Sequence, residues 1–161
     1  MLATVDIIES ISVMKTFHQT LSIKTSNCLE FIDITEQIID LVKKSQISNG
    51  IINIQTKHTT TGIIINEHEP LLLSDIKSTL ERLVPQEITY QHNNFKIRTV
   101  NMTANERENG HSHCKAIFLR TSETLNIFAG ELQLGTWQRI FLLELDSSQT
   151  RNISVMLMGM V

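Results

Sequence analysis

Residues 50–58 alternate between apolar and polar side chains, and this alternation restricts the fold more than any other part of the chain. Successive side chains of a β-strand point to opposite faces, so Ile52, Ile54 and Thr56 share one face. The same period places His58 on that inward face, at the rim of a core. A lone histidine in such a position would most simply cap the end of a strand.

Polar side chains surround the apolar segment that follows. Three threonines and Gly62 stand at its start, and the acidic and histidine side chains of residues 67–69 follow it. A strand that only filled a core would not need these polar ends. We therefore expect the chemistry of the protein to lie at the two ends of residues 62–65.

A second histidine group lies in Gly110-His111-Ser112-His113. We predict that it opens a strand continuing over residues 114–120, and histidines two apart on a strand point to the same face. That spacing suits one metal ion or one anionic group. The polar run 96–109 shows neither the helix period nor the strand period, and its length predicts a functional or mobile loop.

The first half of the chain predicts strands and two main helices. Regular alternation begins at Met14, so we expect residues 1–13 to be an extension and residues 14–161 to form a single domain. A short strand over residues 29–34 precedes a helix that Thr35 can cap. A second helix begins at Pro70, and Pro85 terminates it. Five side chains give the second helix a predicted buried face: Leu72, Leu73, Ile76, Leu80 and Leu83.

The last third of the chain predicts closely spaced strands over residues 124–129, 131–134, 137–145 and 152–160. Gly130 predicts a hairpin turn. The single tryptophan, Trp137, is expected to anchor the core. This order of elements indicates an α+β fold with mostly antiparallel sheets.

Composition excludes several classes of function. The 161 residues contain 14 Lys+Arg and 17 Asp+Glu, a net charge of −3, without the basic stripe that nucleic-acid binding needs. Two cysteines are too few for a disulfide framework and predict a reduced protein of the cytoplasm. No signal peptide and no membrane span are predicted.

Several motifs together resemble the YjbQ-like family, also called the secondary thiamine-phosphate synthase family. The resemblance covers nearly all of residues 14–160, and its motifs are residues 58–62 with 66–67, 90–93, 109–113, 119–122 and 135–138. It implies a compact α+β fold, a homotrimer and a histidine-rich pocket near the subunit contacts. One departure from the family is Arg120, where relatives often carry glycine.

The resemblance also implies roles for individual residues. Three recurring histidines are the expected metal ligands: His58, His92 and His113. The expected catalytic residues are Glu67, Asn66, Asp75, His111 and Gln138. The hydroxyls expected to bind substrate belong to Thr59, Thr60, Ser122 and Thr136.

Two functions are compatible with these residues. The family's credited activity joins hydroxymethylpyrimidine diphosphate to thiazole phosphate, which makes thiamine phosphate and releases pyrophosphate, a leaving group that needs cationic stabilisation. Three histidines prefer zinc or another transition metal to magnesium, so we expect this synthesis to be a side activity of a metal-dependent enzyme on a small phosphorylated substrate. The alternative is a non-catalytic trimer that binds a metal or a small anion.

Overall fold

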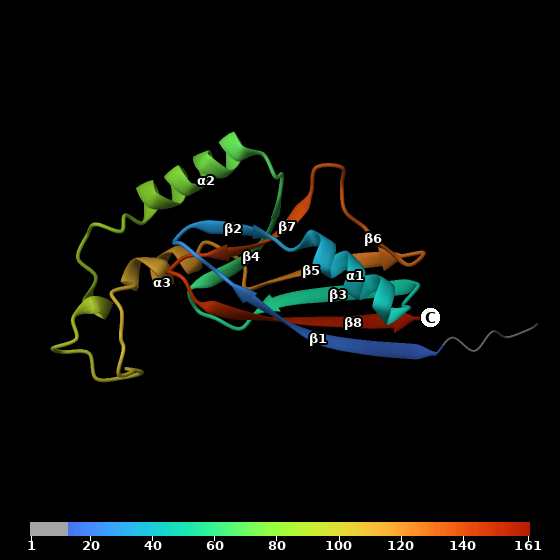
Figure 1. Cartoon of the computed structure of the whole chain (residues 1–161), viewed down its shortest axis with the longest axis horizontal. Coiled ribbons are helices and arrows are strands. Elements are labelled where there is room, and N and C mark those ends of the chain that lie inside the picture. The colour runs from blue at the N-terminus through green and yellow to red at the C-terminus, as the bar shows by residue number, and fades with distance from the viewer. Residues whose placement is uncertain (1–12) are drawn as a thin grey trace, which may run out of the picture.

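A computed structural model describes residues 13–161 of the chain. Its larger sheet has five strands in the order β1 (Met14–Lys24), β8 (Thr150–Met160), β3 (Asn49–Thr56), β5 (Ser122–Phe128) and β6 (Glu131–Leu132). All neighbouring strands of this sheet are antiparallel. Figure 1 shows the long strands β1, β3 and β8 running side by side along the molecule.

A smaller sheet lies over part of the larger one. It contains three antiparallel strands in the order β2 (Glu30–Asp33), β7 (Arg139–Glu144) and β4 (Thr61–Asn66). Strand β7 is buried on both faces, which explains its nearly continuous apolar sequence. The α+β fold with antiparallel sheets predicted from the sequence is confirmed.

Helix α1 (Thr35–Ser45) and the two sheets share the main core. Ile38 and Val42 of α1 pack with Ile52 and Ile54 of β3 and with inward side chains of β7 and β8. The inward face predicted for residues 52–56 is therefore confirmed. Thr35 does not cap α1 with its side chain; instead its Oγ1 accepts a hydrogen bond from the Ile140 N–H at 2.8 Å.

Helix α2 (Pro70–Leu83) covers the outer face of the smaller sheet, so the fold has three layers (Figure 1). Pro70 is its first residue, and the Glu69 carboxylate accepts hydrogen bonds from the N–H groups of Leu71 and Leu72 at 2.9 and 2.7 Å. The predicted start is confirmed. The predicted buried face is confirmed only in part, because Leu80 packs on β7 whereas Leu83 is 58% exposed.

Two predictions in the last third of the chain are wrong. Residues 110–116 form helix α3 (Gly110–Ala116), so the second histidine group opens a helix, and the strand predicted over residues 114–120 does not form. Side chains two apart on a helix point about 200° apart, so His111 and His113 do not share a face. Trp137 lies before β7 and is 71% exposed, so it does not anchor the core.

The turn between β5 and β6 and the start of β1 agree with the predictions from the sequence. Ala129 and Gly130 both have positive φ, as the predicted hairpin turn between β5 and β6 requires. Strand β1 begins at Met14, whereas residues 1–12 of the predicted extension lie outside the described residues. Within residues 13–161, no helix has the length and apolar character needed to cross a membrane.

Candidate functional site

The candidate site is a polar pocket at the end of the molecule opposite the start of β1 (Figure 1). Its volume is about 580 Å³. Three segments line it: the long loop between α2 and α3, the turn after β3 and the turn after β7. The lining residues include Thr59, His92, Arg98, Arg107, Asn109, His113 and Asp146.

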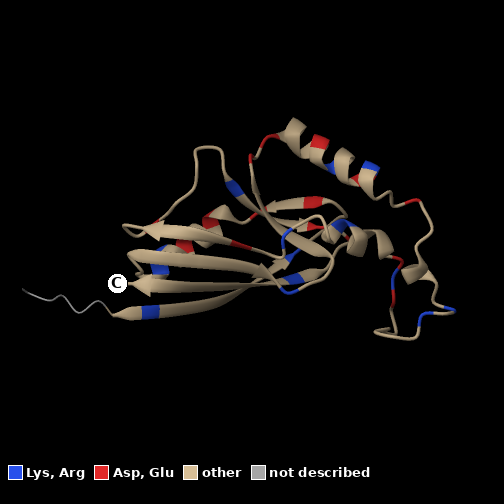
Figure 2. Ribbon diagram, turned by 180° about the vertical axis from the view of Figure 1, so that it is seen from behind, with Lys and Arg blue, Asp and Glu red and all other residues tan. Residues whose placement is uncertain are grey.

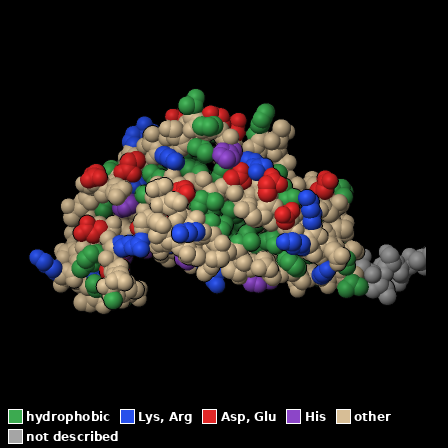
Figure 3. Space-filling view, viewed as in Figure 1, with side chains coloured by type: hydrophobic (Ala, Val, Ile, Leu, Met, Phe, Trp, Pro, Cys, Tyr) green, Lys and Arg blue, Asp and Glu red, His purple; other side chains and the backbone are tan. Residues whose placement is uncertain are grey.

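The loop that supplies most of this lining is held by its own polar contacts. Arg98 donates to Glu106 Oε1 at 2.9 Å and to the Asn101 carbonyl at 2.8 Å. The Thr103 N–H donates to Glu106 Oε2 at 2.9 Å. In Figure 2 the ribbon of this loop carries both basic and acidic positions, and Figure 3 shows charges of both signs at this end of the surface. The polar run 96–109 thus builds one wall of the pocket.

His92 and His113 meet in the pocket. His92 lies in the short 3₁₀ helix η1 (Gln91–Asn93), and His113 lies in α3. Their ring centroids are 4.6 Å apart, and the rings are tilted by 57°. His92 Nε2 is buried and has no hydrogen-bond partner among residues 13–161.

The environment of His113 favours its neutral form. Burial is the largest cause that lowers the pKa of His113, and the neighbouring His92 imidazole and Arg98 guanidinium lower it further. Its imidazole therefore keeps an unprotonated nitrogen at neutral pH. Such a nitrogen can bind a metal ion or accept a proton.

His58 does not join the other two histidines. Its Nε2 accepts a hydrogen bond from the Asn152 N–H at 2.8 Å, and the Lys57 N–H donates to the Asn152 carbonyl at 3.2 Å. Burial and the nearby Arg151 charge lower the pKa of His58. Throughout the described part of the chain, no group of three or more His, Cys, Asp or Glu side chains could hold a metal ion. The structure therefore brings together two of the three histidines predicted as ligands.

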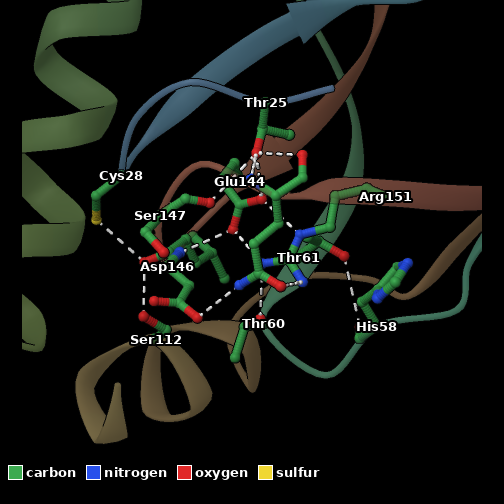
Figure 4. Close-up of polar contacts among 12 residues, drawn as sticks. Thr25, Cys28, His58, Thr60, Thr61, Ser112, Glu144, Asp146, Ser147 and Arg151 are labelled. Atoms are coloured by element: carbon green, nitrogen blue, oxygen red, sulfur yellow. Dashed lines mark hydrogen bonds and ion pairs between the residues drawn. The ribbon is translucent and has the colours of Figure 1, made fainter. Parts of the chain in front are cut away.

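A buried ion pair beside His58 was not predicted. Figure 4 shows Arg151 of β8 extending toward Glu144 of β7. The Arg151 side chain is 4% exposed and that of Glu144 is fully buried. Arg151 Nη2 also donates to Thr60 Oγ1 at 3.1 Å, and Thr25 Oγ1 donates to Glu144 Oε2 at 3.0 Å. Thr60, expected to bind substrate, is thus 4% exposed and engaged within the protein.

His111 belongs to a different cluster from His113. The Lys115 side chain is fully buried, and its Nζ lies 2.9 Å from Glu81 Oε2 and 3.3 Å from His111 Nδ1. Burial above all, and then the Lys115 charge, lowers the pKa of His111. This cluster joins α3 to α2. His111 lines a smaller pocket of about 270 Å³ with Glu87 and Glu108.

The other residues expected in the site are dispersed. Asn66 and Gln138 line a separate pocket of about 500 Å³ together with Phe118. Gln138 Oε1 accepts from the Gly135 N–H at 2.8 Å, and Asn66 Oδ1 accepts from the Glu67 N–H at 2.9 Å. Of the four remaining residues expected in the site, Glu67 and Ser122 are partly buried, whereas Asp75 and Thr136 are exposed.

Comparison with known proteins gives consistent matches over most of the chain. Residues 19–160 match the family model described as UPF0047 protein YjbQ-like. A UPF0047 protein of Methanothermobacter thermautotrophicus is 40% identical over 146 residues, which cover 91% of this chain and 94% of that one. UPF0047 protein YugU of Bacillus subtilis is 30% identical and covers 88% of this chain and 98% of its own.

Solved structures share the fold. The crystal structure of a YbjQ-like protein of unknown function from Sulfolobus solfataricus P2 has a TM-score of 0.81 at 34% identity and covers 91% of this chain and 99% of that one. A conserved protein of the YjbQ/UPF0047 family from Clostridium acetobutylicum has a TM-score of 0.74 at 33% identity, with 89% and 99% of the two chains covered.

Proposed function

The chain belongs to the YjbQ-like UPF0047 family, and from this premise we propose that it is a small metal-assisted enzyme acting on a phosphorylated compound. The reaction to test is the transferase activity implied by the sequence resemblance, in which hydroxymethylpyrimidine diphosphate and thiazole phosphate form thiamine phosphate. The observation that carries the proposal is the pairing of His92 with His113 in a pocket that two arginines also line.

The arginines support a phosphorylated ligand. Arg107 donates to Ser147 Oγ, and within residues 13–161 its guanidinium forms no ion pair with a carboxylate. Arg98 is partly neutralised by Glu106 at 2.9 Å. A guanidinium without a carboxylate partner can give parallel N–H groups to a phosphate. Arg107 is therefore the proposed anchor for the anionic group.

The two imidazoles support a divalent metal ion. His92 Nε2 is a buried nitrogen that no other described residue of the chain hydrogen-bonds, and the neutral form of His113 has a free lone pair. Imidazole nitrogens suit zinc or another transition metal better than magnesium. We expect His92 and His113 to hold the ion, which would stabilise negative charge on a phosphate oxygen.

In the proposed reaction, the pocket residues would act on the leaving pyrophosphate. The thiazole nitrogen attacks the methylene carbon of the pyrimidine, and the carbon–oxygen bond to the diphosphate breaks as the new carbon–nitrogen bond forms. Arg107 and Arg98 stabilise the charge that develops on the pyrophosphate. Thr59, which lines the same pocket and is exposed, can donate a hydrogen bond to it.

Trimeric assembly is part of the same proposal. The five-stranded sheet packs on the core with one face, and its other face carries Met156, Met158 and Met160, which are 40, 43 and 42% exposed. Ile51 of the adjacent strand β3 extends this apolar surface and is 39% exposed. Methionine-rich surfaces of this kind occur at protein interfaces. They support packing of copies through this face.

Incubation of the purified protein with both substrates and Mn²⁺, Co²⁺, Zn²⁺ or Mg²⁺ tests the proposal. We expect thiamine phosphate and pyrophosphate in equal amounts, and a loss of 100-fold or more in Arg107→Gln, on the order seen when one stabilising donor is removed. Arg82→Gln, on the exposed side of α2, is the matched control. Phosphate binding without turnover would favour the non-catalytic alternative.

A further inference from the structure

Within residues 13–161, two buried polar atoms of the pocket have no hydrogen-bond partner. They are His92 Nε2 and Asn109 Oδ1, and both residues line the pocket that also contains His113. Buried polar atoms of native proteins are nearly always paired, so an unpaired nitrogen and an unpaired oxygen in one pocket indicate a missing partner. We propose that Asn109 Oδ1 is a metal ligand alongside His92 and His113, in the place that the family resemblance implies for His58.

The orientation of the Asn109 amide identifies the oxygen as the available atom. Asn109 Nδ2 donates to Asp146 Oδ2 at 3.1 Å, and a carboxylate accepts hydrogen bonds but does not donate them. The amide therefore cannot be turned over without losing this bond. Asp146 is itself fixed, since Gln149 Nε2 donates to the same oxygen at 3.0 Å and the Asp146 N–H donates to Glu144 Oε1 at 2.9 Å.

The backbone brings Asn109 and His113 to the same side of α3. Asn109 is the residue immediately before the helix, and its carbonyl accepts a hydrogen bond from the His113 N–H at 3.3 Å. Residues four apart at a helix end lie one above the other. His92 completes the group, because its ring is 4.6 Å from that of His113.

His58 cannot take the third position in this conformation. A neutral imidazole has one lone pair, and that of His58 at Nε2 accepts the Asn152 N–H at 2.8 Å. Its other nitrogen then carries the proton. Two imidazole nitrogens and one amide oxygen form a mixed donor set that suits Co²⁺, Zn²⁺ or Mn²⁺ and leaves positions for substrate and water.

This inference rests on the proposed metal dependence, and direct metal binding tests it without reference to turnover. Titration with Co²⁺, followed by the visible absorption of the bound ion, and competition with Zn²⁺ would give the affinity of the wild type and of Asn109→Leu, Asn109→Asp, His113→Ala and His58→Gln. We expect His113→Ala and Asn109→Leu to weaken binding by at least about tenfold. Asn109→Asp should retain binding, because it keeps an oxygen at the same position. His58→Gln should bind as the wild type does.

The two substitutions of Asn109 separate a ligand from a merely structural residue. Both remove the N–H group that holds Asp146, and Asn109→Asp also sets a second carboxylate against it. A structural role therefore predicts a loss in the Asp variant at least as large as in the Leu variant, which would overturn the assignment. Wild-type affinity in Asn109→Leu, or a loss in His58→Gln equal to that in His113→Ala, would also overturn it while leaving the proposed function intact. A wild-type protein that binds none of these ions would refute the metal dependence as well.

Discussion

The His58 side chain accepts a hydrogen bond from the backbone N–H of Asn152, with 2.8 Å between Nε2 and N. The adjacent Lys57 N–H donates to the carbonyl of the same Asn152, so the turn after β3 is bound to β8 at two points. Thr59, which lines the pocket, follows directly in the chain. His58 therefore positions the turn that contributes Thr59 to the pocket.

Replacement of His58 by alanine should cost about 0.5–1.5 kcal/mol of unfolding free energy, the contribution of one hydrogen bond. Urea denaturation measures it. His58→Gln offers a side-chain oxygen as acceptor and should recover part of the loss. If His58→Ala were as stable as the wild type while binding less Co²⁺, the positioning role would be wrong and ligation by His58 would be supported.

Stability should decrease as the pH falls below about 6.5, the usual pKa of histidine. Burial is the largest cause that lowers the pKa values of His58, His111 and His113. Above the pKa of these histidines in the unfolded chain, they are neutral in both the folded and the unfolded state, and the protein has its full stability. Below that pKa the histidines of the unfolded chain bind protons that those of the folded chain do not, so the unfolding free energy decreases. Each histidine contributes at most about 1.4 kcal/mol per pH unit.

Thermal unfolding between pH 8 and pH 5 checks this expectation, since most carboxylates titrate below that range. The melting temperature should be constant from pH 8 to pH 7 and then decrease. A melting temperature that rose between pH 7 and pH 5 would contradict it. The variant His58→Gln, which lacks one of the three groups, should show a smaller decrease than the wild type.

The buried Lys115 predicts an asymmetry between two substitutions. Its Nζ is 2.9 Å from Glu81 Oε2, and the Lys115 side chain is fully buried whereas Glu81 is 40% exposed. Glu81→Ala leaves an ammonium group buried without its carboxylate, which costs about 3–5 kcal/mol. Lys115→Met fills the same space with an apolar side chain and lets Glu81 turn to water. We therefore expect Glu81→Ala to be much less stable than Lys115→Met in urea denaturation. Equal losses of unfolding free energy in the two variants would contradict this asymmetry.

The regular parts of the fold could be predicted because their signals are local. The period of two in β3 and the Pro70 start of α2 depend on residues that are neighbours in sequence. Helix α3 could not be predicted in this way, because its polar residues are buried by contacts with distant segments: Lys115 by α2, and Ser112 Oγ by a hydrogen bond of 2.7 Å to the Leu145 carbonyl.

The candidate site was predictable in part for the same reason. His92 lies in η1 and His113 lies in α3, and a long loop joins these two elements. No periodicity of the sequence indicates that the two rings meet. The buried pair of Arg151 and Glu144 did leave a signal. Arg151 lies on the same face of β8 as the inward side chains Ile153 and Val155. The strand period therefore places a charged side chain in the core, where it needs a carboxylate partner.

We expect a trimer in solution, with the exposed methionines of β8 at the contact, and light scattering at micromolar concentration measures the mass. Met158→Glu places a charge in the middle of this surface, where Met158 pairs across the sheet with Thr16 and Ile51. Burying an unpaired carboxylate is costly, so the variant should dissociate toward monomers. Thr79→Glu adds the same charge on an exposed position of α2 and should keep the mass of the wild type. A wild-type monomer, or a Met158→Glu protein with unchanged mass, would exclude this face as the interface.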